Sequence, residues 1–109
     1  MDQTNLARNL IIHAGNAKSL AMEVISMAKK GQFDEADKKQ KEATAAMHEA
    51  HNQQTEILRM SLENMDEGVT MLMAHAQDHM MNAITTMDMA NEFVELYKII
   101  YENRKELVS

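Results

Sequence analysis

Apolar residues recur along this chain at intervals of three and four, the spacing that places them on one face of an α-helix. Polar residues and glycine interrupt the pattern near Gly31 and again at 64–68. We therefore expect three helices, at about 3–30, 34–61 and 69–105. In the first break Gly31 follows two lysines, an arrangement typical of a helix end, and we expect Asp34 to cap the next helix.

Each expected helix carries a seam of mostly small apolar residues. Alanine is frequent in the seams, so the helix backbones can approach one another closely. The alternation of three and four predicts an all-α fold, an antiparallel three-helix bundle. The seams are Leu10, Ala14, Ala17, Ala21, Val24 and Ala28; Phe33, Ala36, Gln40, Ala43, Met47, Ala50, Gln54 and Ile57; and Met73, Ala76, Met80, Ala83, Met87, Ala90, Val94 and Tyr97.

The third expected helix has a second face opposite its seam. A helix in an isolated three-helix bundle should present polar residues there, but the lower half of this face is apolar. Large exposed apolar patches usually mark interfaces, so we expect this helix to pack against copies of itself. The second face consists of Met71, His75, Asp78, Asn82, Met89, Phe93, Leu96 and Ile100.

Composition narrows the classes of protein. The 109 residues suffice for one domain, 1–109. With no proline, three glycines and 4% aromatic residues, a β-sandwich or barrel is excluded. The net charge of −6 argues against nucleic-acid binding. The absence of cysteine excludes disulfides and thiol nucleophiles.

The start of the chain does not resemble a signal peptide, and no apolar run approaches the ~20 residues that span a bilayer. We expect a soluble, cytoplasmic protein without membrane insertion.

A polar cluster on the second face is the main candidate for chemistry. His75, Asp78 and His79 share a face because they are three and four positions apart. The residue pattern leaves three interpretations open: a phosphoryl carrier with His75 as nucleophile, a metal site at the histidine pair, or polar residues that merely contact solvent. Ala76 stands where a zincin has its glutamate, which disfavours metalloprotease chemistry.

The other histidines carry weaker patterns. His13 adjoins the first seam, and we interpret it as structural. His48 and His51 are three positions apart and could bind a metal, although a surface role is the simpler explanation for an HxxH pattern on a charged helix.

The segment from His75 to Met81, with the sequence HAQDHMM, resembles the characteristic motif of the lactose/cellobiose-type enzyme IIA of the bacterial phosphoenolpyruvate-dependent sugar phosphotransferase system. The resemblance covers nearly the whole chain. It includes LII at 10–12, GNAKSL at 15–20, KGQFDEA at 30–36, EAHNQQT at 49–55 and ELY at 95–97. Ala76, where lactose-type members tend to have glycine, favours the cellobiose/chitobiose branch.

The resemblance implies a homotrimer of three-helix bundles with the third helices inside. It implies a phosphotransferase component in which His75 accepts a phosphoryl group on Nε2 from phospho-HPr and passes it to a cysteine of the IIB component. It also implies one Mg²⁺ per trimer, held by Asp78 from each subunit. The transported sugar would be a β-linked disaccharide of cellobiose, chitobiose or lactose type, chosen by the membrane component rather than by this chain.

Side-chain chemistry suggests supporting roles near the phosphoryl group. His79 and Gln77, together with Gln54 of a neighbouring subunit, could donate hydrogen bonds to its oxygens. The alternative function is a metal-binding or adaptor helical bundle without phosphotransfer. In the adaptor, methionine-rich surfaces would bind partner proteins.

Overall fold

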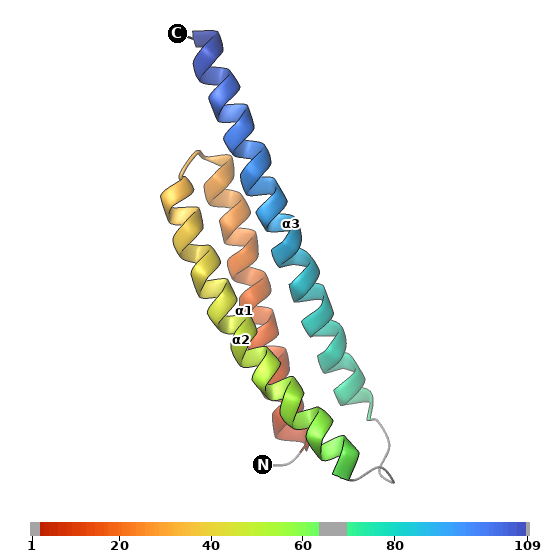
Figure 1. Ribbon diagram of the computed structural model, residues 1–109. Coiled ribbons are helices and arrows are strands. Elements are labelled where there is room, and N and C mark those ends of the chain that lie inside the picture. The colour runs from red at the N-terminus through yellow and green to blue at the C-terminus, as the bar shows by residue number, and fades with distance from the viewer. Residues whose placement is uncertain (1–2, 64–69, 109) are drawn as a thin grey trace.

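The computed structural model describes residues 3–63 and 70–108, and three long helices account for nearly all of them. Helix α1 spans Gln3–Lys29, α2 spans Phe33–Glu63 and α3 spans Met71–Val108. The helices run alternately up, down and up in a rod of 67 × 17 × 16 Å (Figure 1). The prediction of an all-α antiparallel three-helix bundle is confirmed.

The predicted seams form the core. All six residues of the first seam are buried, and the buried residues of α2 and α3 include Ala43, Ile57, Met80 and Ala83. No polar or charged side chain in the described residues is fully buried. The residues of the second and third seams that stay partly exposed lie on the flanks of the core: Phe33, Gln40, Gln54, Met87 and Tyr97.

Helix α1 is the central element of the bundle. It packs along most of its length against both α2 and α3, whereas α2 and α3 touch each other at few points. Alanines line α1 on these contacts, at Ala14, Ala17 and Ala21. Small side chains allow two helices to approach the same third helix closely, and the α2–α3 side is left more open.

The turn between α1 and α2 is closed by a glycine cap. Gly31 has a φ of +78°, the left-handed conformation that favours glycine. The Gln32 N–H donates to the Met27 carbonyl at 2.9 Å and the Gly31 N–H donates to the Ala28 carbonyl at 3.0 Å, which is a Schellman motif. The Ala36 N–H donates to the Gln32 carbonyl at 3.0 Å, so the residue at the N-cap is Gln32. The prediction of Asp34 as the cap was wrong, because the helix starts before it and its carboxylate lies in the first turn.

The C-terminal part of α3 lies over this turn. The Tyr101 hydroxyl donates to the Lys29 carbonyl at 3.0 Å, which satisfies an acceptor at the end of α1. The Tyr101 ring meets the Phe33 ring edge to face, with centroids 5.6 Å apart. Helix α3 then continues beyond the other two helices, so that its end stands clear of the bundle (Figure 1).

The expected helix bounds were close to those observed. Helix α2 ends two residues later than expected and α3 three residues later. The second predicted break, at 64–68, lies outside the described residues. None of the helices in the described ranges has an apolar stretch long enough to cross a membrane.

Candidate phosphoryl-acceptor site

The polar cluster lies near the start of α3, shortly after a threonine cap. The Thr70 hydroxyl accepts a hydrogen bond from the Met73 N–H at 3.1 Å, and the Thr70 carbonyl accepts from the Ala74 N–H at 3.1 Å. A side-chain oxygen at this position satisfies one of the unpaired N–H groups of the first turn. The apolar spacing turns Met73, Ala76 and Met80 toward the core, and His75 faces outward.

The structure brings His75 and His79 into contact. Their Nε2 atoms are 3.1 Å apart, and the rings meet edge to face with centroids 4.5 Å apart and planes at 88°. His75 is exposed and His79 is partly buried. At this distance one neutral imidazole donates its N–H to the lone pair of the other. His75 therefore has a neighbour that can orient its ring while the ring stays accessible.

Asp78 is exposed on the same side of α3 as His75, as the spacing predicted. Within the described part of one chain, no three histidine, aspartate or glutamate side chains lie together as ligands of one metal ion. A carboxylate is a suitable ligand for Mg²⁺, but one chain supplies only this ligand at Asp78. The residue therefore fits a magnesium site only if other copies of the chain contribute.

Gln77 lies on a different flank of α3. It follows His75 by two positions, which corresponds to about 200° around the helix. Its Oε1 accepts a hydrogen bond from Gln54 Nε2 of α2 at 2.8 Å, and this bond bridges the two helices that otherwise touch little. Sequence reasoning placed Gln54 in a neighbouring subunit's site and missed this bond within one chain. Gln54, a polar residue in an otherwise apolar seam, was the available signal. In a single chain Gln77 does not face His75, so its predicted supporting role stays a prediction.

The other histidines remain apart from this cluster. His48 and His51 are both exposed on α2. His13 is partly buried and lines a shallow groove between α1 and α2 with Asn16 and Glu49. The groove belongs to the side of α1 that packs on α2, so His13 does not share a surface with His75.

The apolar half of the second face of α3 is exposed in the single chain. Met89, Leu96 and Ile100 have 52%, 49% and 46% of their surface accessible, and Phe93 is partly buried where it stacks on Tyr97. The sequence prediction that the three-helix bundle leaves this stripe uncovered is confirmed for Met89, Leu96 and Ile100, whereas Phe93 is partly covered. The stripe continues the face that carries His75 and Asp78.

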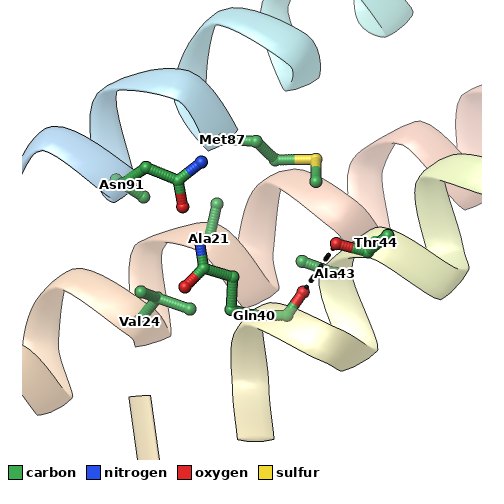
Figure 2. Close-up of a pocket in the computed structure, with 8 residues that line it drawn as sticks. Ala21, Val24, Gln40, Ala43, Thr44, Met87 and Asn91 are labelled. Atoms are coloured by element: carbon green, nitrogen blue, oxygen red, sulfur yellow. Dashed lines mark hydrogen bonds between the residues drawn. The ribbon is translucent and has the colours of Figure 1, made fainter. Parts of the chain in front are cut away.

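A pocket between the three helices lies away from this cluster (Figure 2). It holds about 250 Å³ of space, part of it open to solvent, where α2 and α3 stand apart. Alanines and the side chains of Gln40, Thr44, Met87 and Asn91 line it. Met87 is twelve residues after His75, which is about 18 Å along the helix. This pocket is therefore separate from the histidine pair.

Comparison with known proteins places the chain in a family. Residues 5–98 match the family described as the PTS system, lactose/cellobiose-specific IIA subunit. The chain belongs to this IIA family. The match covers all three helices, including the histidine pair. The chain is thus a IIA component of a sugar-specific phosphotransferase system, as the resemblance of its HAQDHMM segment indicated.

Individual relatives agree with this placement. The lichenan-specific phosphotransferase enzyme IIA component of Bacillus subtilis is 46% identical over 95 residues, which cover 87% of this chain and 86% of the relative. The crystal structure of the PTS cellobiose-specific enzyme IIA from Bacillus anthracis has a TM-score of 0.87 and 39% identity, covering 94% of each chain. The solution structure of the IIA(chitobiose)–HPr complex of Escherichia coli has a TM-score of 0.74 and 28% identity, covering 93% of this chain and 98% of that one.

Proposed function

We propose that the chain is a phosphocarrier that accepts a phosphoryl group on Nε2 of His75. The observation that carries the proposal is the contact of the His75 and His79 Nε2 atoms on an exposed face of α3, in a chain of the IIA family. An acceptor histidine needs an accessible, unprotonated ring nitrogen, and a neighbour that fixes its tautomer. His75 meets the first need and His79 meets the second.

The chemistry requires little covalent help from the protein. In the proposed first step, the His75 Nε2 lone pair attacks the phosphorus of phospho-HPr, and the phosphorus–nitrogen bond to the donor histidine breaks. His75 then carries its proton on Nδ1, and His79 donates its Nε2–H, first to the His75 lone pair and then to a phosphoryl oxygen. Positioning and charge stabilisation account for most of the rate in such transfers.

In the proposed second step a cysteine thiolate of the IIB component attacks the same phosphorus, the bond from phosphorus to Nε2 breaks, and His75 leaves as a neutral imidazole that keeps its proton on Nδ1. The E. coli neighbour solved as a complex with HPr supports HPr as the donor. The names of the B. subtilis and B. anthracis relatives support a β-linked sugar of the cellobiose type as the transported substrate.

We further propose that the chain functions as a homotrimer with the α3 helices inside. The exposed stripe of Met89, Phe93, Leu96 and Ile100 supports this arrangement, because it would be covered by the same stripe of other copies. Asp78 lies on the same face, so three carboxylates would converge near the axis. Bound Mg²⁺ would neutralise their mutual repulsion, and a carboxylate donor suits that ion.

The test of the carrier is phosphorylation by phosphoenolpyruvate, enzyme I and HPr. We expect one acid-labile phosphoryl group per chain in the wild type and none in His75→Ala. The matched control is His48→Ala, which removes an equally exposed histidine from α2 and should leave labelling unchanged. Circular dichroism checks that both variants fold. Labelling that persists in His75→Ala would place the acceptor elsewhere and overturn the proposal.

A further inference from the structure

The arrangement of the histidine pair has a consequence beyond phosphoryl transfer. The two rings do not merely lie side by side, because their Nε2 atoms contact each other at a separation of 3.1 Å. Their planes are nearly perpendicular, at 88°. In both rings Nε2 is the nitrogen farther from the backbone, and it can act either as a nucleophile or as a metal ligand.

The separation of the Nε2 atoms fits one borderline divalent cation. Bonds from imidazole nitrogen to zinc are about 2.0–2.1 Å long. Two such bonds that span 3.1 Å enclose an angle of about 95–102° at the metal. This value lies between the ~90° of adjacent ligands in an octahedron and the ~109° of a tetrahedron, so the two nitrogens can keep their separation. On binding, the His79 proton moves from Nε2 to Nδ1 by exchange with water, and each ring turns so that its Nε2 lone pair faces the ion.

Access and charge also favour binding. His75 is exposed and His79 is partly exposed, so an ion can reach the pair from solvent with its remaining waters in place. The chain carries a net charge of −6, and Asp78 is on the same side of α3. No third histidine or carboxylate of the described residues joins the pair, so water completes the coordination. Imidazole ligands select zinc and copper over magnesium, which distinguishes this site from the carboxylate site proposed at Asp78.

We propose that His75 and His79 form a two-histidine chelate for Zn²⁺ and that zinc and the phosphoryl group compete for Nε2 of His75. Zinc uses the lone pair with which His75 would attack phosphorus, so a chain with bound zinc cannot accept the group. The competition rests on the proposed carrier function, whereas the chelate itself does not. Zinc would thereby inhibit the carrier by a direct block of the acceptor atom.

Zinc binding is tested first, without any phosphoryl donor. Titration with Zn²⁺ in the presence of excess Mg²⁺, followed by calorimetry and by ¹H–¹⁵N spectra of the imidazole rings, should show one zinc per chain and shifts of Nε2 in His75 and His79. His79→Ala should bind zinc at least about tenfold more weakly, because the second ligand no longer acts at high effective concentration. His51→Ala, which removes a histidine from the other closely spaced pair, should bind like the wild type.

Unchanged zinc affinity in His79→Ala, or zinc-dependent shifts confined to His48 and His51, would overturn the chelate.

The competition between zinc and the phosphoryl group is then measured as the ratio of the phosphorylation rate without zinc to the rate with zinc, for each variant separately. We expect this ratio to be at least about tenfold larger in the wild type than in His79→Ala at the same zinc concentration. Equal ratios would mean that zinc acts on enzyme I or HPr and would overturn the competition. A wild type that takes up no phosphoryl group even without zinc would contradict the proposed function, while the binding titration would still decide the chelate.

Discussion

At the level of single residues, Gly15 and Gly31 differ in what a side chain would meet. Gly15 is inside α1, and apart from its chain neighbours and the nearby backbone of the same helix no atom lies within 4 Å of the place where its Cβ would be. Gly31 has a φ of +78°, and a Cβ there would lie 2.6 Å from Cε1 of Tyr101. A side chain at Gly15 would thus meet no obstacle within one chain. At Gly31, both the left-handed backbone and the contact with Tyr101 require glycine.

We expect Gly15→Ala to raise the free energy of unfolding by about 0.5–1 kcal/mol, because alanine loses less backbone entropy in a helix. Gly31→Ala should lower it by at least about 1–2 kcal/mol, because a left-handed conformation is strained with a Cβ and the Tyr101 ring must move. Urea denaturation at one fixed protein concentration measures both changes. Destabilisation by Gly15→Ala would mean that another chain packs closely against this part of α1.

The histidine pair shows how much of the candidate site was predictable at this scale. Helical spacing alone placed His75, Asp78 and His79 on one side of α3, and the structure agrees. Spacing did not indicate that the two Nε2 atoms meet, because this depends on side-chain rotamers. Tyr101 was missed as a cap, although it continues the spacing of the α3 seam, because its partner carbonyl is 72 residues away in the chain.

At the level of elements, α3 is unusual in having two apolar faces. One packs on α1 and the other, with Met89, Leu96 and Ile100, is exposed in the single chain. In the proposed trimer, a charged side chain on the second face would be buried without a partner in each of the three chains. Burying an unpaired charge costs far more free energy than placing the same charge at an exposed site.

We therefore expect Leu96→Lys combined with Ile100→Lys to dissociate the trimer and leave the helices of each chain folded. Sedimentation velocity would measure the mass, and circular dichroism the helix content. Ile12→Lys is the matched control, because Ile12 is 63% exposed on α1 and lies outside the stripe; it should leave the trimer intact. A wild-type protein that sediments as a single chain, or a double variant that remains trimeric, would contradict the arrangement with α3 inside.

The bounds of the elements were also largely predictable, and their errors have local causes. Asp34 is a favourable capping residue, but the Schellman turn at Gly31 directs the chain into α2 two residues earlier than a cap at Asp34 would allow. Asp34 stabilises the first turn instead, as a negative charge near the positive end of the helix dipole. The residue types near a helix start therefore indicate where the preceding turn lies, but not which residue is the first of the helix.

At the level of the whole molecule, the proposed trimer links assembly to Mg²⁺ through Asp78. Three carboxylates that converge on an axis repel one another, and an ion that binds only the assembled form stabilises that form. Replacing each carboxylate by an apolar side chain would remove both the repulsion and the need for the ion.

We expect Asp78→Leu to remain trimeric and to have the same thermal midpoint with and without a chelator. The wild type should lose stability when Mg²⁺ is removed, by about 2.7 kcal/mol if the ion was at a hundred times its dissociation constant. Differential scanning calorimetry measures the thermal stability and sedimentation velocity measures the oligomeric state, each with and without EDTA. Dissociation of Asp78→Leu into single chains would show that the ion is required for assembly.

The sequence alone predicted the number of helices, their approximate bounds, the core seams and the face that carries the histidines, because all of these follow from the 3.6-residue period of a helix. It could not predict that α1 would be the central helix, that Gln54 would bond to Gln77, or that Tyr101 would close the turn at Gly31. These features depend on the distances and angles between helices far apart in the chain. Such distances result from how side chains pack across the whole bundle, and no local pattern encodes them.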